Sequence, residues 1–309
     1  MKKLSIIVPC YNEEKALPFF FEDISIHTKK LEESIEYVFV NDGSRDNTLN
    51  VLIEIKQKNP NEDIKIVDFS RNFGKEAGIL AGLKTASGDY IVIMDADMQD
   101  PPFLLPKMLE TLKNEAYDSV ATYRVDRKGE PLIRSFFARK FYQLINRISE
   151  VDIVDGSRDY RLMTRSMVDA IISLSEYHRF SKGIFVWVGF KTKYLEFENV
   201  ERVAGETKWS FWKLFRYAIE GIVAFTTFPL RLSTFFGIMV SSLSFAYMLF
   251  VMVKAMLYGD PVAGYPSMMV IILFLGGIQL LSLGILGEYL AKTYMEVKKR
   301  PHYIIKEIH

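Results

Sequence analysis

The 309-residue sequence contains a single cysteine, Cys10, and has almost no net charge, with 39 Lys and Arg against 38 Asp and Glu. One cysteine excludes an internal disulfide, so the chain is not an oxidised secreted scaffold. The balanced charge argues against a nucleic-acid-binding protein, because such proteins usually carry a basic excess. The sequence also has no P-loop and no GxGxxG motif, so it does not support an ATPase or a dinucleotide site.

Charge is scarce in one stretch near the C-terminus. Residues 232–290 contain only three charged side chains, and the apolar runs within them cover residues 232–257 and 267–290. Each run is long enough to cross a hydrocarbon core of ~30 Å as a helix. The alternative, a buried helical hairpin of a soluble protein, fits poorly with two runs of this length and so little charge. We therefore expect two transmembrane helices.

The flanks of these runs indicate an orientation. The loop between them has no Lys or Arg, whereas Lys213 and Arg231 precede the pair and Lys298 and Arg300 follow it. The positive-inside rule then places the polar part of the chain and both termini in the cytoplasm. We expect no signal peptide, because the first apolar stretch is short and ends at Pro9.

Strand-like and helical patterns alternate between residues 4 and 123. The expected strands cover residues 4–9, 37–40, 64–69, 90–94 and 119–122, and the expected helices cover residues 13–30, 47–58, 75–85 and 102–114. This alternation, with continuously apolar strands, predicts an α/β fold with a parallel sheet covered on both faces. Such sheets bind ligands at the carboxyl ends of their strands.

Polar clusters follow the first four expected strands: PCYNEE, NDGS, SRNFGKE and DADMQDPP. Each cluster alone is also compatible with a turn or a helix cap. The DAD segment is more specific, because Asp95 and Asp97 directly follow a buried apolar strand and a divalent cation would offset their repulsion. Gln99 offers a neutral oxygen ligand. We therefore expect Mg²⁺ or Mn²⁺ at Asp95, Asp97 and Gln99.

Six motifs occur in a fixed order before the two apolar runs: PCYNEE, NDGS, RNFGKEAG, DADMQDPP, SRDYRLM and RVAGETKWS. With this combination the chain resembles the polyprenyl-phosphate glycosyltransferases of glycosyltransferase family 2, and within them the bacterial GtrB-type enzymes, relatives of dolichol-phosphate mannose synthase. The resemblance implies a GT-A (Rossmann-like) fold, a UDP-sugar donor and undecaprenyl phosphate as acceptor. It implies inverting transfer of a single hexose, from UDP-glucose or UDP-N-acetylglucosamine, for glycosylation of cell-envelope polymers.

The resemblance also implies roles for individual residues. Those for the nucleotide-sugar are Pro9, Tyr11, Glu13, Asp42 and Asp95. Those for the phosphates of donor and acceptor are Arg124, Arg134, Arg202 and Lys208. Asp159, in SRDYRLM, falls at the position of the catalytic carboxylate. A phosphate monoester is largely ionised at neutral pH, with a second pKa of ~6, so Asp159 is either a general base or a residue that orients the acceptor.

Together these patterns divide the chain into four parts. They are a cytoplasmic catalytic domain at residues 1–208, interfacial amphipathic helices at 209–231, two transmembrane helices within 232–290 and a cytoplasmic tail at 291–309. Aromatic and basic residues intermix in residues 131–149 and 209–228, which indicates either a membrane interface or ordinary core packing. The resemblance implies a multi-pass protein of the bacterial inner membrane, a homo-oligomer (a tetramer), and a small membrane flippase as a candidate partner.

Two alternative functions stay open. A processive polysaccharide synthase usually has more membrane helices and a Gln-x-x-Arg-Trp motif, which this chain lacks. A catalytically inactive scaffold for a flippase would have no reason to keep Asp95, Asp97, Asp159, Arg202 and Lys208 together. The pattern does not distinguish glucose from N-acetylglucosamine or galactose, because sugar choice depends on a few contacts to the sugar ring.

Overall fold

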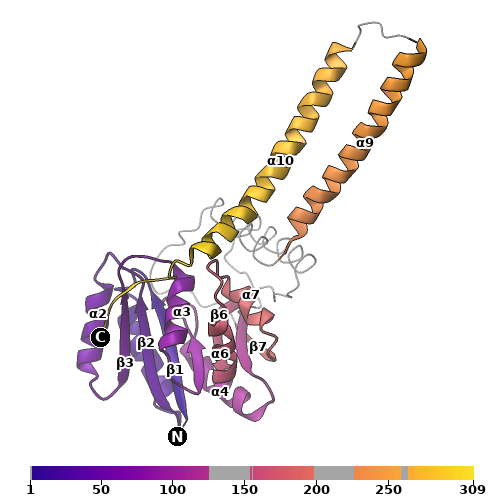
Figure 1. The fold of residues 1–309 in the computed structure, drawn as a ribbon. Coiled ribbons are helices and arrows are strands. Elements are labelled where there is room, and N and C mark those ends of the chain that lie inside the picture. The colour runs from indigo at the N-terminus through magenta and orange to yellow at the C-terminus, as the bar shows by residue number, and fades with distance from the viewer. Residues whose placement is uncertain (1, 125–153, 155, 198–225, 259–263) are drawn as a thin grey trace. The chain divides into compact units, whose positions relative to one another are not determined.

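The computed structural model describes residues 2–124, 154, 156–197, 226–258 and 264–309 (Figure 1). The chain divides into two compact units. The first comprises Met1–Ala218 together with Arg300–His309, and the second comprises Ile219–Lys299.

The first unit is built on a mixed sheet with the strand order β7-β5-β6-β4-β1-β2-β3-β8. Its strands are β1 (Lys3–Cys10), β2 (Ser34–Asn41), β3 (Asp63–Phe69), β4 (Tyr90–Ile93), β5 (Ser119–Arg124), β6 (Ser157–Thr164), β7 (Thr192–Phe197) and β8 (Ile305–Ile308). The five expected strands are all present. In the order β3-β2-β1-β4, strands β2 and β3 lie on one side of β1 and β4 lies on the other. The strand order therefore reverses between β1 and β4, and ligands of doubly wound sheets bind at such a switch point.

The expectation of a parallel sheet is confirmed for β1 to β4 and wrong at both sides of this core. Strand β6 is antiparallel to β4 and to β5, and β8 is antiparallel to β3. The pattern behind the expectation covers only residues 4–123, whereas β6 and β8 come later in the chain. β6 inserts between β4 and β5 in the opposite direction, and the last residues of the chain form the edge strand β8.

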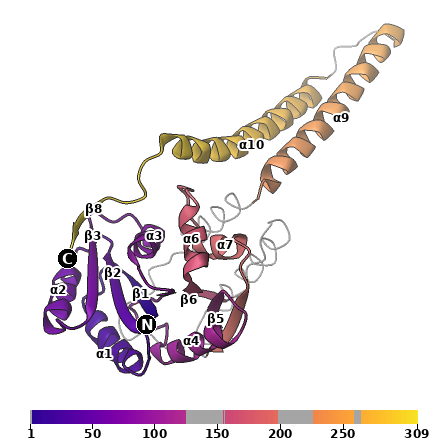
Figure 2. The same cartoon turned by 60° about the horizontal axis from the view of Figure 1, so that its bottom comes forward.

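Helices cover both faces of the sheet (Figure 2). One face carries α1 (Leu17–Thr28), α2 (Thr48–Lys58) and α4 (Leu105–Asn114), the last preceded by the short 3₁₀ turn η1 (Pro102–Leu104). The other carries α3 (Lys75–Thr85), α6 (Arg165–Ser173) and α7 (Ser181–Trp187). The helix expected at residues 13–30 begins only at Leu17, where a proline follows in the first turn, because residues 13 and 14 belong to a loop.

Side chains alternate between the two faces of each strand, and the buried ones form the core between the sheet and the helices. Leu4, Ile6 and Val8 of β1 point to the α1 side and pack with Phe20 and Phe39 in one buried cluster. The intervening side chains point to α3, which approaches β1 closely at Gly82. A Cβ atom at Gly82 would lie 2.2 Å from Cγ2 of Ile7, so only glycine permits this approach. The close packing fixes the N-terminus of α3 over the carboxyl end of the sheet.

A buried carboxylate holds the amino ends of the strands together. Glu36 of β2 is fully buried; it accepts hydrogen bonds from Lys65 at 2.5 Å and from the backbone N–H of Ser87 at 2.8 Å, and it also bonds to Ser5. Lys3 lies 3.3 Å from the same carboxylate. Burial alone would raise the pKa of Glu36, but these donors outweigh it and hold the pKa at about 2.

We expect Glu36→Gln to lower the free energy of unfolding by about 3 kcal/mol, because it leaves two lysines beside an uncharged buried group. The folded-state pKa lies below the unfolded value, so this stabilisation is fully present above about pH 4.5 and is lost as the pH falls towards 2. Thermal unfolding of both proteins between pH 3 and 8 measures it. Glu54→Gln, which removes an exposed partner of Lys58 on α2, is the control and should change little.

The second unit contains two long helices, α9 (Phe228–Tyr258) and α10 (Tyr265–Lys298), which run side by side in Figures 1 and 2. Both are long and apolar enough to cross a membrane, and their large apolar side chains are mostly exposed. The expected runs 232–257 and 267–290 lie within them. Helix α10 extends to Lys298, so the segment expected as a tail at 291–309 begins as helix and ends as strand β8.

Candidate active site

The loops that follow β1 and β2 are joined by hydrogen bonds from one asparagine. Asn12 has a φ of 59°, a left-handed conformation that costs free energy for a residue other than glycine. Its backbone N–H donates to Ser44 Oγ at 3.0 Å, and its Oδ1 accepts from the backbone N–H of Arg45 at 2.8 Å. The predicted nucleotide residues Pro9 and Glu13 flank this position. Tyr11 is 40% exposed, so its ring is available to a ligand.

Asp42, another predicted nucleotide residue, joins the loop after β2 to the start of α3. It is buried, and its two carboxylate oxygens accept hydrogen bonds from the backbone N–H groups of Phe73 at 2.6 Å and Gly74 at 2.9 Å. Burial raises the pKa of Asp42 despite these donors. Gly43 makes the contact possible, because a Cβ there would lie 2.3 Å from the backbone of Arg71. Asp42 thus positions Lys75, the first residue of α3.

The predicted metal ligands lie on a tightly folded loop after β4. Asp97 Oδ1 accepts a hydrogen bond from the backbone N–H of Gln99 at 3.1 Å, and Met98 between them has a φ of 62°. Asp100, which is buried, accepts from the backbone N–H of Asp95 at 2.9 Å and forms a 3.2 Å ion pair with Arg158. Asp100 and Arg158 therefore fix the loop that carries the three predicted ligands.

The antiparallel strand β6 brings the predicted catalytic carboxylate to this loop. Ile93 of β4 pairs with Arg161 of β6, so the same register places Asp159 opposite Asp95. The ammonium group of Lys75 lies between them, 2.7 Å from Asp95 Oδ1 and 2.6 Å from Asp159 Oδ2. The side chains of Asp95 and Asp159 are 24% and 18% exposed, so both remain accessible to a ligand.

Cations around Asp159 control its protonation. Burial alone would raise the pKa of Asp159, but Lys75, Lys182 and Arg158 outweigh burial and hold the pKa well below its usual range. Burial alone would lower the pKa of Lys75, but Asp159 and Asp95 outweigh burial and raise that pKa. A carboxylate with such a low pKa is a weak proton acceptor, which favours an orienting role over general base catalysis.

Glu76 anchors the first turn of α3 to α7. Its carboxylate accepts a hydrogen bond from the backbone N–H of Ser181 at 3.1 Å, and it also bonds to the Ser181 hydroxyl. Burial raises the pKa of Glu76 to about 7. With Asp42 holding Gly74 and Glu76 holding Ser181, the backbone of Lys75 is fixed on both sides.

The oxygen atoms on this loop fit a divalent cation whose coordination would be completed by a substrate. Asp95 and Asp97 would supply carboxylates and Gln99 an amide oxygen, whereas the described residues contain no cluster of three His, Cys, Asp or Glu side chains that would form a complete cage. Mg²⁺ binds proteins in this way, through one or two carboxylates together with substrate phosphates and water.

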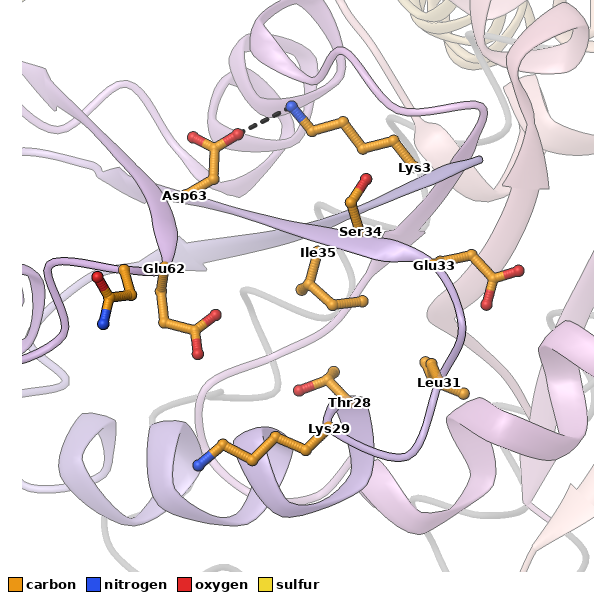
Figure 3. A pocket seen from close by; sticks show the side chains of 10 residues that line it. Lys3, Thr28, Lys29, Leu31, Glu33, Ser34, Ile35, Glu62 and Asp63 are labelled. Atoms are coloured by element: carbon orange, nitrogen blue, oxygen red, sulfur yellow. Dashed lines mark hydrogen bonds and ion pairs between the residues drawn. The ribbon is translucent and has the colours of Figure 1, made fainter. Parts of the chain in front are cut away.

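A hollow in the described part of the chain lies elsewhere. It has a volume of about 460 Å³, and its lining includes Lys3, Ser34 and Asp63 at the amino ends of β1, β2 and β3 (Figure 3). Lys3 and Asp63 form a 2.8 Å ion pair across it. The opposite edge of the sheet carries Asp95, in the loop after β4, and Asp159, near the amino end of the antiparallel strand β6, so we place the candidate active site there.

Of the four residues predicted to bind phosphates, the structure describes one. Arg124 ends β5, next in the sheet to the strand that carries Asp159, while Arg134, Arg202 and Lys208 lie outside the described residues. The residues whose roles the sequence interpretation missed include Lys75, Glu76, Asp100, Arg158 and Ser181. All except Ser181 stand in motifs that the sequence analysis singled out, but only Asp100 and Arg158 adjoin predicted site residues, which was the available signal for those two.

Comparison with known proteins identifies the family of the chain. Residues 5–172 match the model of the Glycosyl transferase family 2. The chain is 44% identical to an uncharacterised glycosyltransferase of Synechocystis sp., over 99% of this chain and 95% of that protein. It is 42% identical to a prophage bactoprenol glucosyl transferase homologue of Escherichia coli, over 99% of both chains. It is 43% identical to a prophage-derived bactoprenol glucosyl transferase of Shigella flexneri, over 99% and 98%.

Among solved structures, the chain is similar to glucosyl-3-phosphoglycerate synthase from Mycobacterium tuberculosis, with a TM-score of 0.47 and 16% identity over 72% of this chain and 78% of that chain. This similarity is too low to bear on the substrate or the metal. The family match and the nearly full-length relatives are decisive: the chain belongs to glycosyl transferase family 2, and it has the mixed α/β sheet domain of the GT-A type followed by two apolar helices.

Proposed function

We propose that the protein transfers a single glucose from UDP-glucose to undecaprenyl phosphate, with inversion at the anomeric carbon. The observation that carries the proposal is the meeting of Asp95 and Asp159 at the carboxyl end of the sheet. The names of two nearly full-length relatives, both bactoprenol glucosyl transferases, favour glucose and this lipid class over N-acetylglucosamine.

Sugar transfer from a nucleotide diphosphate builds negative charge on the leaving UDP. A divalent ion bound by Asp95, Asp97 and Gln99 would act as a Lewis acid towards that charge. The loops around Tyr11 and Asp42 lie beside the same strand ends and would hold the nucleotide. Asp159, kept ionised by its cations, would orient the acceptor rather than remove a proton, because a phosphate monoester is already largely ionised at neutral pH.

The acceptor carries a long apolar chain, so the enzyme must act at a membrane. Helices α9 and α10 supply candidate spans, and the distribution of Lys and Arg around them supports a catalytic domain on the cytoplasmic side of the bacterial inner membrane. The basic residues Arg124, Arg134, Arg202 and Lys208 would neutralise the phosphates of donor and acceptor, which otherwise repel each other. The product would supply glucose for glycosylation of a cell-envelope polymer. A tetramer and a flippase partner remain predictions.

We expect UDP release from UDP-glucose to require both undecaprenyl phosphate and a divalent cation. The full-length protein in detergent is incubated with and without each, and UDP is measured by a coupled assay. UDP-N-acetylglucosamine is tested in parallel and should react at least tenfold more slowly if glucose is the sugar.

Mass spectrometry of the lipid product separates the alternatives. One hexose per lipid supports the proposal, whereas a ladder of hexoses indicates a processive synthase. If no UDP-sugar releases UDP under any condition, the protein is an inactive scaffold. If UDP release is the same in EDTA as with Mn²⁺ or Mg²⁺, the metal site is contradicted.

A further inference from the structure

One ammonium group joins the two carboxylates on which the proposed function depends. Lys75 contacts Asp95 and Asp159 at distances of 2.7 and 2.6 Å, although these residues are 20 and 84 positions away in the sequence. The lysine side chain is 44% exposed, so it has room to move. Its backbone does not, because Asp42 holds the preceding residue and Glu76, the next residue, is bonded to α7.

The contact with Asp95 conflicts with the metal site. Asp95 cannot hold an ammonium group and a divalent cation at contact distance without strong Coulomb repulsion between the two cations. Lysine has a flexible four-carbon stem, so its head can rotate away while the backbone stays in place. Asp159 already contacts the same ammonium group and is the partner that remains.

We propose that Lys75 is a positioning residue for the transfer reaction: it holds Asp95 before the metal arrives, yields Asp95 to the metal, and then keeps Asp159 in place beside the donor. This inference rests on the proposed function, because it takes Asp95 as a metal ligand. It predicts that removal of the lysine has opposite effects on metal binding and on turnover.

The test measures Mn²⁺ binding to the full-length protein in detergent by electron paramagnetic resonance of the free ion, with and without UDP. We expect Lys75→Met to bind Mn²⁺ about tenfold more tightly than wild type, since one competing charge is gone. We expect its kcat to fall at least tenfold, with the KM for UDP-glucose changed less than threefold. Lys75→Arg, which keeps the charge, should bind Mn²⁺ as wild type does.

Lys84→Met is the matched control, because Lys84 is exposed in the last turn of the same helix and its removal takes away the same charge. It should leave both readings unchanged. Unchanged or weaker Mn²⁺ binding by Lys75→Met overturns the proposal, as does a large rise in the KM for the donor with kcat intact, which would indicate direct donor contact. If the wild type does not bind Mn²⁺ even with UDP, the metal assignment itself is overturned. This outcome is distinguishable from failure of the Lys75 proposal, which requires a wild type that binds Mn²⁺.

Discussion

Asp97→Asn should reduce glucose transfer about a thousandfold or more while the protein stays folded. Asp97 supplies a charged ligand to the predicted metal, and a metal that stabilises a leaving diphosphate contributes several kcal/mol to the transition state. The substitution keeps the shape of the side chain and an oxygen that can accept the N–H of Gln99. Transfer is measured as UDP release in the presence of undecaprenyl phosphate, and folding by the midpoint of thermal unfolding.

The dependence on metal concentration makes this test specific. A weakened site should recover part of its activity as Mn²⁺ is raised, whereas a misfolded protein should not. Asp169→Asn, at an exposed carboxylate on α6, serves as the control and should behave as wild type. Full activity of Asp97→Asn at low Mn²⁺ would falsify the metal assignment.

Asp159→Asn should lower kcat about a hundredfold or more and leave donor binding within a few-fold of wild type. The substitution removes the charge that holds Lys75 and orients the acceptor, but it leaves the nucleotide loops after β1 and β2 intact. Losses of this size are typical when one preorganised electrostatic group is removed from a reaction centre. Donor affinity is measured by calorimetry with UDP, and kcat by product formation.

The pH profile separates an orienting role from base catalysis. Because the pKa of Asp159 is held well below its usual range, this group stays ionised between pH 5 and 8 and should not shape the profile there. The residual activity of Asp159→Asn should therefore follow the same pH dependence as wild type. Loss of an acidic limb in the variant would show that Asp159 accepts a proton, contrary to our assignment.

Much of the part of the fold that contains β1 to β4 was predictable from the sequence, because its signals are local. Strands such as β1 and β4 are continuous apolar runs, and the polar clusters directly follow them. The position of α3 was predicted at the residues observed, Lys75–Thr85. Parallel pairing then follows from the helical connections, and the convergence of the clusters follows from parallel pairing.

The position of Asp159 beside Asp95 was not predictable from these patterns alone. It depends on β6, which lies far along the chain and pairs antiparallel with β4, and no local periodicity specifies such a long-range pairing. Resemblance to a family singled out Asp159 and Asp95, but not the lysine that joins them. The role of Lys75 was missed for the same reason, since a lysine at the start of a helix gives no sign of which carboxylates it contacts.

The C-terminal strand has a consequence for the order in which the protein is made. Residues of β8 pair with β3, and the ring of Tyr303 stacks on Phe69, with 4.9 Å between the ring centres. The two apolar helices are therefore an insertion within one folding unit, and strand β8 of that unit is synthesised after both helices. Until then the edge of β3 is unpaired and open to association with other chains. Cutting the chain before the helices to obtain a soluble enzyme leaves that edge exposed permanently.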